Sequence, residues 1–236
     1  VLIIGAGMSG LVAARDLASS GVRPILIDKS RAVGGRMASR RFGGGRFDHG
    51  AQHFSVRSDS FRRAVAEWRN EGLVHEWFTS PSDTRTDRAV EPRHVATGGM
   101  RNLPEALVQS HEVHLDTLIT RLEIHDDGIA ALDGARAVAV ADAAILTPPV
   151  PQMLQLLDAG AVLPDPEIRT TLEAISYDPC LAVMATLDEP SGLPDGHLSF
   201  GSGPIAWMAD NQHKGASRIP AVTIHSSPSF AATHLE

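Results

Sequence analysis

The chain opens with an apolar run that leads into the glycine pattern Gly5-x-Gly7-x-x-Gly10, and this pattern constrains the fold more than any other feature. The apolar run predicts a β-strand, and the stretch after the glycines has the periodicity of an amphipathic helix. A second apolar run then ends at Asp28, 18 residues after Gly10. Strand, glycine turn, helix, strand and acid in this order indicate a parallel βαβ unit that binds a dinucleotide.

Each residue of the pattern has a physical role in such a unit. Gly5 permits the tight turn between strand and helix, Gly7 lets the backbone approach a pyrophosphate, and Gly10 lets the helix pack closely on the strand. The helix N-terminus supplies unpaired N–H groups to the phosphates. Asp28 is placed to accept hydrogen bonds from a ribose hydroxyl. The pattern does not identify the dinucleotide, and a glycine turn with a structural role alone is the alternative.

Charge and cysteine content exclude several kinds of partner and site. The formal net charge is −7 and there is no basic block, which argues against a nucleic-acid partner. The single cysteine, Cys180, allows no internal disulfide and is expected as a buried strand residue in a reducing cytosol. No secretory signal and no apolar run long enough to span a bilayer are visible, so we expect a cytoplasmic protein with no membrane partner. Because Val1 already lies in a strand and is not Met, we expect the start of the chain to be missing.

Segments of different periodicity alternate along the chain. Strand, helix and strand over 1–28 are followed by a glycine- and arginine-rich stretch, 29–50, and by a helical pattern over 60–72. Short strands dominate 112–146, and another strand is predicted over 177–187. This order predicts a parallel α/β nucleotide domain assembled from separated segments, with a second domain inserted.

Three further segments have features of a cofactor groove. Arg36 follows Gly34-Gly35 and can donate hydrogen bonds to phosphate oxygens, although a flexible basic loop is the alternative. The segment 48–53, Asp-His-Gly-Ala-Gln-His, follows a glycine turn and suits the lining of such a groove. Thr147 and Pro148 end an apolar strand that we expect to be fully buried, and α/β sheets bind ligands at such strand ends.

Eleven histidines raise the question of a metal site. His49 and His53 are four residues apart, and His111 and His114 are three apart, but a zinc site needs three or four converging ligands. The first pair lies in a glycine-rich loop and the second at the start of a strand, so no metal site is predicted. For His53 we expect a place beside the cofactor.

Trp207, Asn211 and His225 are the candidates for a substrate pocket. An aromatic face and an amide suit a nicotinamide ring, whereas a core tryptophan and a turn asparagine are the structural alternative. His225 lies on a predicted strand and either faces the pocket or is a packed or solvated histidine.

Together these motifs resemble the flavin-containing amine oxidase superfamily, and within it the renalase-like enzymes. The resemblance runs over nearly the whole chain. The first two motifs are shared by many flavoproteins, and the later motifs are more specific to this family. The matching segments are 5–10, 34–37, 48–52, 145–151 and 223–226, with further echoes at 176–177 and 233–236.

The resemblance implies an α/β fold in which a discontinuous Rossmann-like FAD-binding domain carries an inserted mixed α+β substrate domain. The FAD-binding domain would comprise 1–59 and 98–150, and the substrate domain 60–97 and 151–236. The family's last flavin-binding segment, a Gly-Asp motif, is absent, so we expect a C-terminal segment of the FAD-binding domain to be missing.

The resemblance also implies FAD held without a covalent link. The glycine turn and Arg36 would hold the phosphates, and Asp28 the adenosine ribose. Residues 51–53 would lie beside the isoalloxazine ring, and Ile119 would be the strand residue whose backbone meets adenine. The full implied set is Gly5, Gly7, Ser9, Gly10, Asp28, Lys29, Gly35, Arg36, Met37, Ala51, Gln52, His53, Ile119, Thr147 and Pro148.

As a reaction, the resemblance implies oxidation of 2- or 6-dihydro isomers of NAD(P)H. Hydride passes to the flavin, NAD(P)⁺ is released, and O₂ takes the electrons to give hydrogen peroxide. Such a hydride transfer depends on the position of the substrate ring over the flavin rather than on a strong base, so the catalytic residues are not assigned.

Two alternatives stay open. One is another flavin oxidase that acts on amines or desaturates a carbon skeleton, and the other is a non-catalytic nucleotide-binding protein. The single dinucleotide fingerprint argues against a reductase with separate FAD and NADPH domains. The expected partners are a small-molecule substrate and O₂, and the oligomeric state does not follow from the sequence.

Overall fold

The computed structural model describes residues 1–80, 91–126 and 128–235, and the chain packs as two compact units. Both units are discontinuous in sequence, in agreement with the predicted α/β fold in which one domain interrupts another. Unit 1 is Val1–Gly35 with Leu107–Tyr177, and unit 2 is Arg36–Ala106 with Asp178–Glu236.

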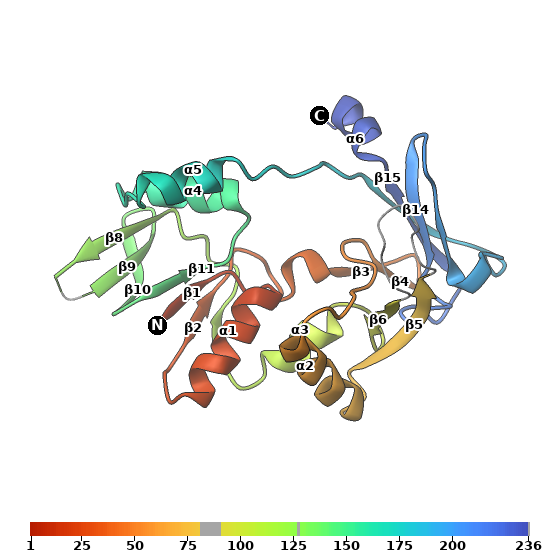
Figure 1. The fold of residues 1–236 in the computed structure, drawn as a ribbon, viewed down its shortest axis with the longest axis horizontal. Coiled ribbons are helices and arrows are strands. Elements are labelled where there is room, and N and C mark those ends of the chain that lie inside the picture. Colours follow the sequence, from red (N-terminus) through yellow and green to blue (C-terminus); the bar gives the residue numbers. More distant parts are fainter. Residues whose placement is uncertain (81–90, 127, 236) are drawn as a thin grey trace. The chain divides into compact units, whose positions relative to one another are not determined.

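A four-stranded parallel sheet forms the centre of unit 1 (Figure 1). It contains β1 (Leu2–Ile4), β2 (Ile25–Ile27), β7 (Glu112–His114) and β11 (Ala144–Leu146) in the order β11-β1-β2-β7. Helix α1 (Met8–Ser19) connects β1 to β2, which confirms the predicted βαβ unit. The chain order reverses between β1 and β11, and ligands of open α/β sheets bind at the carboxyl ends of the strands at such a point.

Successive apolar side chains along the short strands point to opposite sides, so both faces of this sheet are buried. Ile3 and Leu26 lie on one face and pack in a cluster with Leu11 of α1. Leu2 and Ile27 lie on the other face and pack in a second cluster. Because successive strand residues point to opposite faces, strands of three residues suffice to bury apolar side chains on both sides.

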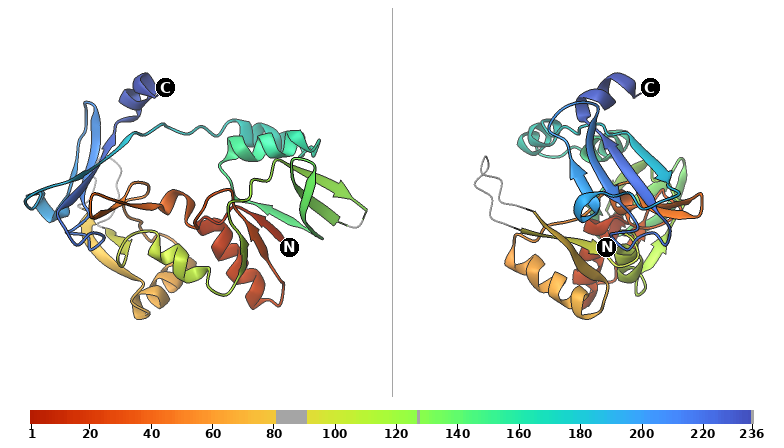
Figure 2. Two further views of the ribbon diagram at one scale, coloured as in Figure 1. Left: turned by 180° about the vertical axis from the view of Figure 1, so that it is seen from behind. Right: turned by 90° about the vertical axis from the view of Figure 1, so that its right-hand side faces the viewer.

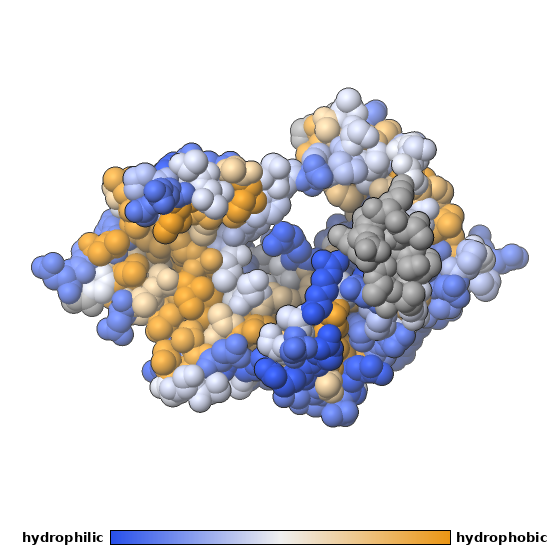
Figure 3. Space-filling model, in the orientation of Figure 1, coloured by the Kyte–Doolittle hydropathy of each residue, from blue (hydrophilic) through white to orange (hydrophobic). Residues whose placement is uncertain are grey.

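An antiparallel sheet and two helices complete unit 1. Strands β8 (Arg121–His125), β9 (Gly128–Asp133) and β10 (Arg136–Ala141) pair in the order β10-β9-β8. Helix α4 (Val150–Ala159) packs on β8, and α5 (Pro166–Glu173) packs on α4, as Figure 1 shows. Apolar side chains gather on the surface over these strands (Figure 3).

Unit 2 begins with two hairpins and two helices. The hairpins pair β3 (Ser39–Phe42) with β4 (Gly45–Asp48), and β5 (Val74–Ser80) with β6 (Glu91–Ala96). Helix α2 (Asp59–Asn70) lies between them in sequence. Ser58 caps it by accepting a hydrogen bond from the Phe61 N–H.

A four-stranded antiparallel sheet completes unit 2 (Figure 2). Strands β12 (Ala182–Thr186), β13 (His197–Ser199), β14 (Ile205–Asp210) and β15 (Ala221–Ser226) have the order β12-β15-β14-β13. Strand β15 also contacts β4, so the sheet packs against the first hairpin. Helix α6 (Pro228–His234) follows β15.

Helix α3 (Asn102–Leu107) connects the units in sequence, and short 3₁₀ turns lie at Gly35–Met37 and Pro194–Gly196. No helix among the described residues has both the length and the apolar character needed to cross a membrane.

Three expectations about individual residues were wrong. Cys180 is exposed and precedes β12, because the strand predicted over 177–187 is shorter than its apolar pattern suggested. Strand β11 is half-buried rather than fully buried. Ile119 lies between β7 and β8 rather than in a strand, although its side chain is buried in the core. The predicted domain bounds divide the chain at other residues than the compact units do, and they stay a prediction.

Candidate functional site

The N-terminus of α1 has the features of an anion-binding end. Gly7 is its N-cap, no side chain caps it, and its first turn holds no acidic residue. A Cβ at Gly7 would meet no protein atom within 4 Å, so the Gly7 Cα faces open space. Unpaired N–H groups and the helix dipole make such an end favourable for phosphate. The residues present therefore fit a phosphate-bearing cofactor.

Close backbone packing holds this end in place. A Cβ at Gly10 would lie 2.1 Å from the carbonyl oxygen of Gly5, so only glycine allows α1 to approach β1 this closely. The Thr147 hydroxyl donates to the carbonyl oxygens of Ile4 at 2.9 Å and Gly5 at 3.2 Å. Thr147, at the end of β11, thus fixes the turn at the end of β1.

Asp28 lies at the carboxyl end of β2, as expected. Its Oδ2 accepts a hydrogen bond from the Ala6 N–H at 2.6 Å, and its Oδ1 accepts one from the Ser30 N–H at 2.7 Å. Two backbone donors therefore orient the carboxylate beside the glycine turn. A carboxylate has about four acceptor positions, so lone pairs are left for ribose hydroxyls.

The Gly34-Gly35 turn lies against the same loop. The Gly34 N–H donates to the Ala6 carbonyl at 2.9 Å, and Gly34 forms a parallel bridge with Gly7. A Cβ at Gly35 would lie 3.4 Å from the Gly7 Cα. The sequence-predicted glycines are thus brought together within unit 1.

Four more predicted FAD-binding residues lie in unit 1 with different exposures. Ser9 is exposed on α1, and Pro148 is half-buried directly after Thr147. Lys29 is exposed, and its Nζ donates to Gln152 Oε1 at 3.2 Å. The Ile119 side chain packs into the core, so only its backbone is available to a ligand.

In unit 2, the backbone of Arg36 packs against residues 50 and 51, where the predicted flavin-adjacent segment begins. The Ala51 N–H donates to the Arg36 carbonyl at 2.8 Å. A Cβ at Gly50 would lie 2.1 Å from the same oxygen, so glycine is required at this crossing. Met37 follows Arg36 in the 3₁₀ turn and is half-buried.

A buried ion pair, which the sequence analysis missed, holds the flavin-adjacent segment. Lys214 is 1% exposed and Asp48 is fully buried, and Lys214 Nζ lies 3.0 Å from Asp48 Oδ2. The same Nζ donates to Gln52 Oε1 at 3.0 Å and lies 5.3 Å from the centre of the Trp77 ring. Burial lowers the pKa of Lys214, and the charge of Asp48 opposes that shift. A lone lysine in a polar turn carries no sequence signal of burial.

Asp48 and Gln52 extend this pair into a network. The Gln52 amide nitrogen donates to the Asp48 carbonyl at 2.5 Å. Asp48 Oδ1 accepts from the Ser39 hydroxyl at 2.5 Å and from the Met100 N–H at 2.9 Å. The Gln52 side chain is therefore engaged by the protein, and Gln52 positions its segment.

Asn211 belongs to the same network. It is fully buried, its Oδ1 accepts from the Asp48 N–H at 3.1 Å, and its Nδ2 donates to Thr223 Oγ1 at 2.9 Å. These bonds connect β4 to β15. The structure thus gives Asn211 a structural role, and its predicted place in a substrate pocket stays a prediction.

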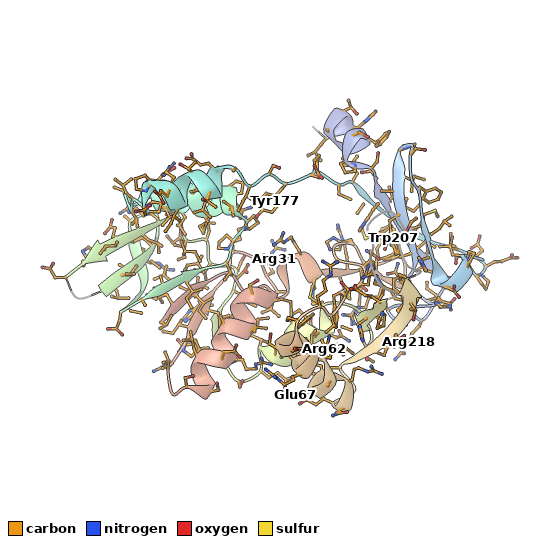
Figure 4. The ribbon with its side chains drawn as sticks, in the orientation of Figure 1. Arg31, Arg62, Glu67, Tyr177, Trp207 and Arg218 are labelled. Atoms are coloured by element: carbon orange, nitrogen blue, oxygen red, sulfur yellow. The ribbon has the colours of Figure 1, made fainter. Side chains whose placement is uncertain are left out.

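Five rings form what we call the aromatic cluster, and Trp207 of β14 is labelled in Figure 4. The ring centres of His53 and Trp207 are 5.4 Å apart, and those of His53 and Phe78 are 5.6 Å apart. The His197 ring stacks on Phe78 at 3.7 Å, and its centre lies 5.1 Å from that of Trp207. The members of the cluster are His53, Trp77, Phe78, His197 and Trp207.

Two polar atoms of this cluster have no partner. His53 Nδ1 and Trp207 Nε1 are buried and form no hydrogen bond with any described residue. Burial, together with the charges of Arg93, Lys214 and His197, lowers the pKa of His53 to about 4. His53 is therefore neutral at pH 7. Buried donors and acceptors without partners are costly, and a ligand that pairs with them removes that cost.

His225 adjoins the cluster through the sheet register. It lies opposite Trp207 on β15, and its Nε2 is 3.1 Å from the His49 carbonyl and 3.4 Å from Gln52 Nε2. Burial lowers its pKa. The structure thus brings Gln52 and His53, predicted beside the flavin, together with Trp207 and His225, predicted in the substrate pocket.

Two family models match the chain. An NAD(P)-binding Rossmann-like domain matches residues 3–68, and a flavin containing amine oxidoreductase matches residues 66–220. Mouse renalase is 25% identical over 254 aligned positions, which cover 100% of this chain and 74% of renalase. Among the described residues, no group of three or more His, Cys, Asp or Glu could hold a metal ion.

Solved structures show the same fold. A protein described as a putative protoporphyrinogen oxidase from Exiguobacterium is 14% identical with a TM-score of 0.72, covering 98% of this chain and 78% of its own. Putrescine oxidase bound to putrescine is 15% identical with a TM-score of 0.68, covering 100% of this chain and 77% of its own.

Proposed function

Because the chain belongs to the flavin-containing amine oxidoreductase family, and is an FAD-dependent oxidoreductase of the renalase-like kind, we propose that it oxidises a 2- or 6-dihydro isomer of NAD(P)H. The products are NAD(P)⁺ and, after reoxidation by O₂, hydrogen peroxide. The likeness to mouse renalase over the whole chain supports this choice within the family. We propose the cytoplasm as the location.

The observation that carries the proposal is the aromatic cluster around His53. It offers ring faces and two ring nitrogens that have no hydrogen-bond partner among the described residues, and no member of it is acidic. The charges that lower the pKa of His53 are all positive. A planar, uncharged dihydropyridine ring fits such a site through stacking and hydrogen bonding.

In this proposal unit 1 binds the cofactor and unit 2 binds the substrate ring. In unit 1, the α1 N-terminus holds phosphate and Asp28 holds the adenosine ribose, as the open cradle at Gly7 and the oriented carboxylate allow. When bound, FAD accepts hydride and passes the electrons on to O₂. In unit 2, the aromatic cluster orients the substrate ring and excludes water, and neutral His53 offers hydrogen bonds without adding charge.

Anaerobic mixing tests the proposal. The FAD-loaded protein is mixed with 6-dihydro-NAD, and the flavin absorption is followed in a stopped-flow instrument. We expect rapid bleaching with 6-dihydro-NAD and slow or no bleaching with ordinary NADH. If the flavin of the loaded protein stays oxidised with both the 2- and the 6-dihydro isomers, the proposal is wrong.

The second candidate is oxidation of an amine, which the description of the matching family model favours. A screen of primary and polyamines for peroxide release would detect it. Peroxide release with an amine, without bleaching by dihydro-NAD(P), would establish this candidate in place of the first.

A further inference from the structure

A cavity in unit 2 is surrounded by arginines that none of the assignments above uses. Its volume is about 430 Å³. Three of its arginines come from the hairpin β3–β4 and the fourth directly precedes α3. Its charged and titratable lining residues are Arg40, Arg41, Arg46, Arg101, His49 and Glu105.

The positive charge of this cavity is largely uncompensated. Among the described residues, only the Arg46 side chain has a side-chain partner, Asn102 Oδ1 at 2.6 Å, and that partner is neutral. Arg40, Arg41 and Arg101 form no ion pair with any other residue that the structure describes. Glu105 is the only acidic residue among the described residues of the lining. In a chain of net charge −7, four guanidinium groups around one cavity indicate selection for an anion.

A buried hydrogen-bond donor without a partner among the described residues also indicates that the cavity binds an anion. Arg101 Nε is buried and has no hydrogen-bond partner among the described residues. His49 has a lowered pKa, caused first by burial and then by the charges of Arg101 and Arg40. His49 is therefore neutral at pH 7 and can accept or donate a hydrogen bond. The cavity thus combines forked guanidinium donors, an orphaned N–H and a neutral imidazole.

We infer that this cavity binds the phosphate groups of the nucleotide substrate, an inference that rests on the function proposed above. Planar guanidinium groups pair with two phosphate oxygens at once, and several of them suit a diphosphate. None of the four arginines belongs to the residues assigned to FAD. A substrate amine would be repelled here, so the cavity selects a nucleotide over an amine.

The chain connects this cavity to the aromatic cluster over a few residues. The hairpin ends at Asp48, His49 lines the cavity, and His53 belongs to the cluster. The His49 carbonyl accepts a hydrogen bond from the His225 ring, whose strand neighbour is Trp207. One short segment therefore carries a residue for the phosphate end and a residue for the ring end of the same substrate.

Calorimetry on the FAD-loaded protein tests the inference, with ADP, adenosine and inorganic phosphate as probes. We expect ADP to bind, adenosine not to bind, and inorganic phosphate to bind more weakly than ADP. Arg101→Gln should weaken ADP binding roughly 10- to 100-fold, since one charge-assisted hydrogen bond is lost. Arg63→Gln, an exposed arginine on α2, is the matched control and should leave ADP binding unchanged.

A kinetic arm separates this inference from the proposed function. Arg101→Gln should raise the substrate concentration for half-maximal flavin reduction by 6-dihydro-NAD, with the limiting rate unchanged. It should have no effect with 6-dihydronicotinamide riboside, which lacks phosphate. If wild-type flavin is reduced by neither compound, the proposed function is wrong, whereas reduction with no effect of Arg101→Gln overturns this inference alone.

Three further outcomes would overturn the assignment to substrate phosphate. Inorganic phosphate bound as tightly as ADP would indicate a site for free phosphate. A lower FAD content in Arg101→Gln would indicate a role toward the cofactor. Binding of ADP that is unchanged in both Arg101→Gln and Arg101→Lys would exclude the cavity, and equal melting temperatures of these variants show that they are folded.

Discussion

At the scale of single residues, Lys214 and Asp48 form a buried ion pair in unit 2. Each is almost fully buried, and each makes further hydrogen bonds besides the ion pair. Transferring two charges into the interior costs several kcal/mol per ion, and only the mutual attraction and added hydrogen bonds offset this cost. The pair fixes the position of the segment that ends in His53, and the loss of either partner would leave a buried charge without compensation.

Replacement of Lys214 by methionine should therefore lower the free energy of unfolding strongly. The buried Asp48 carboxylate would lose its counter-charge, and breaking such a pair costs about 3 to 5 kcal/mol. Urea unfolding measures the free energy of unfolding. Exposed Lys29→Met should change it by less than about 0.5 kcal/mol.

The double variant Lys214→Met/Asp48→Asn checks the reason for that loss. It removes both charges and should recover part of the lost stability. Equal losses in Lys214→Met and Lys29→Met would contradict the role of the buried pair.

At the scale of elements, the crossing of α1 over β1 defines the cofactor-binding end of unit 1. At Gly10, an added Cβ would meet the Gly5 carbonyl at 2.1 Å and Ile3 Cγ2 at 3.2 Å. At Gly7, an added Cβ would meet no protein atom within 4 Å, and its φ of −79° suits any residue. The two glycines therefore serve different purposes, packing and access for a ligand.

Two alanine variants separate these purposes. Gly10→Ala should lower the free energy of unfolding by about 1 to 3 kcal/mol, because the backbone must move apart. Gly7→Ala should leave the unfolding of the FAD-free protein unchanged but weaken FAD binding, because its methyl group enters the space for phosphate. FAD titration and urea unfolding of both variants measure this. Normal FAD affinity in Gly7→Ala would contradict the location of the phosphate site.

At the scale of the whole molecule, the two units should respond differently to acid. The described histidines with lowered pKa all belong to unit 2, and they are His49, His53, His75, His94 and His225. Protonation favours the unfolded state, where the histidine pKa is near 6.5. Stability from these groups is complete well above pH 6.5 and is lost as the pH falls toward the lowered folded-state pKa.

Tryptophan fluorescence can follow this loss in unit 2 alone. All three tryptophans, Trp68, Trp77 and Trp207, lie in unit 2. Between pH 7 and pH 5, His53 alone should lower the stability of unit 2 by roughly 2 kcal/mol, given its folded pKa of about 4. His53→Phe should reduce this dependence. An unfolding midpoint that is the same at both pH values would contradict the assigned shifts.

The dinucleotide-binding unit could be predicted from the sequence, because its signal is local. Glycine spacing, apolar runs and the acid after the second strand all lie within the first 28 residues, and each reports a conformation or contact of its immediate neighbours. Strand ends such as Thr147 were also predictable, since a parallel sheet collects the carboxyl ends of its strands at one edge.

The buried network and the arginine cavity of unit 2 could not be predicted from the sequence, because they form between segments that are far apart along the chain. Lys214 is buried although its sequence context predicts exposure, and Asn211 is engaged by β4 and β15. The aromatic cluster joins residues from 53 to 207, and the arginine cavity joins β3, β4 and the start of α3. Burial and charge compensation depend on neighbours distant along the chain, so no local pattern contains them.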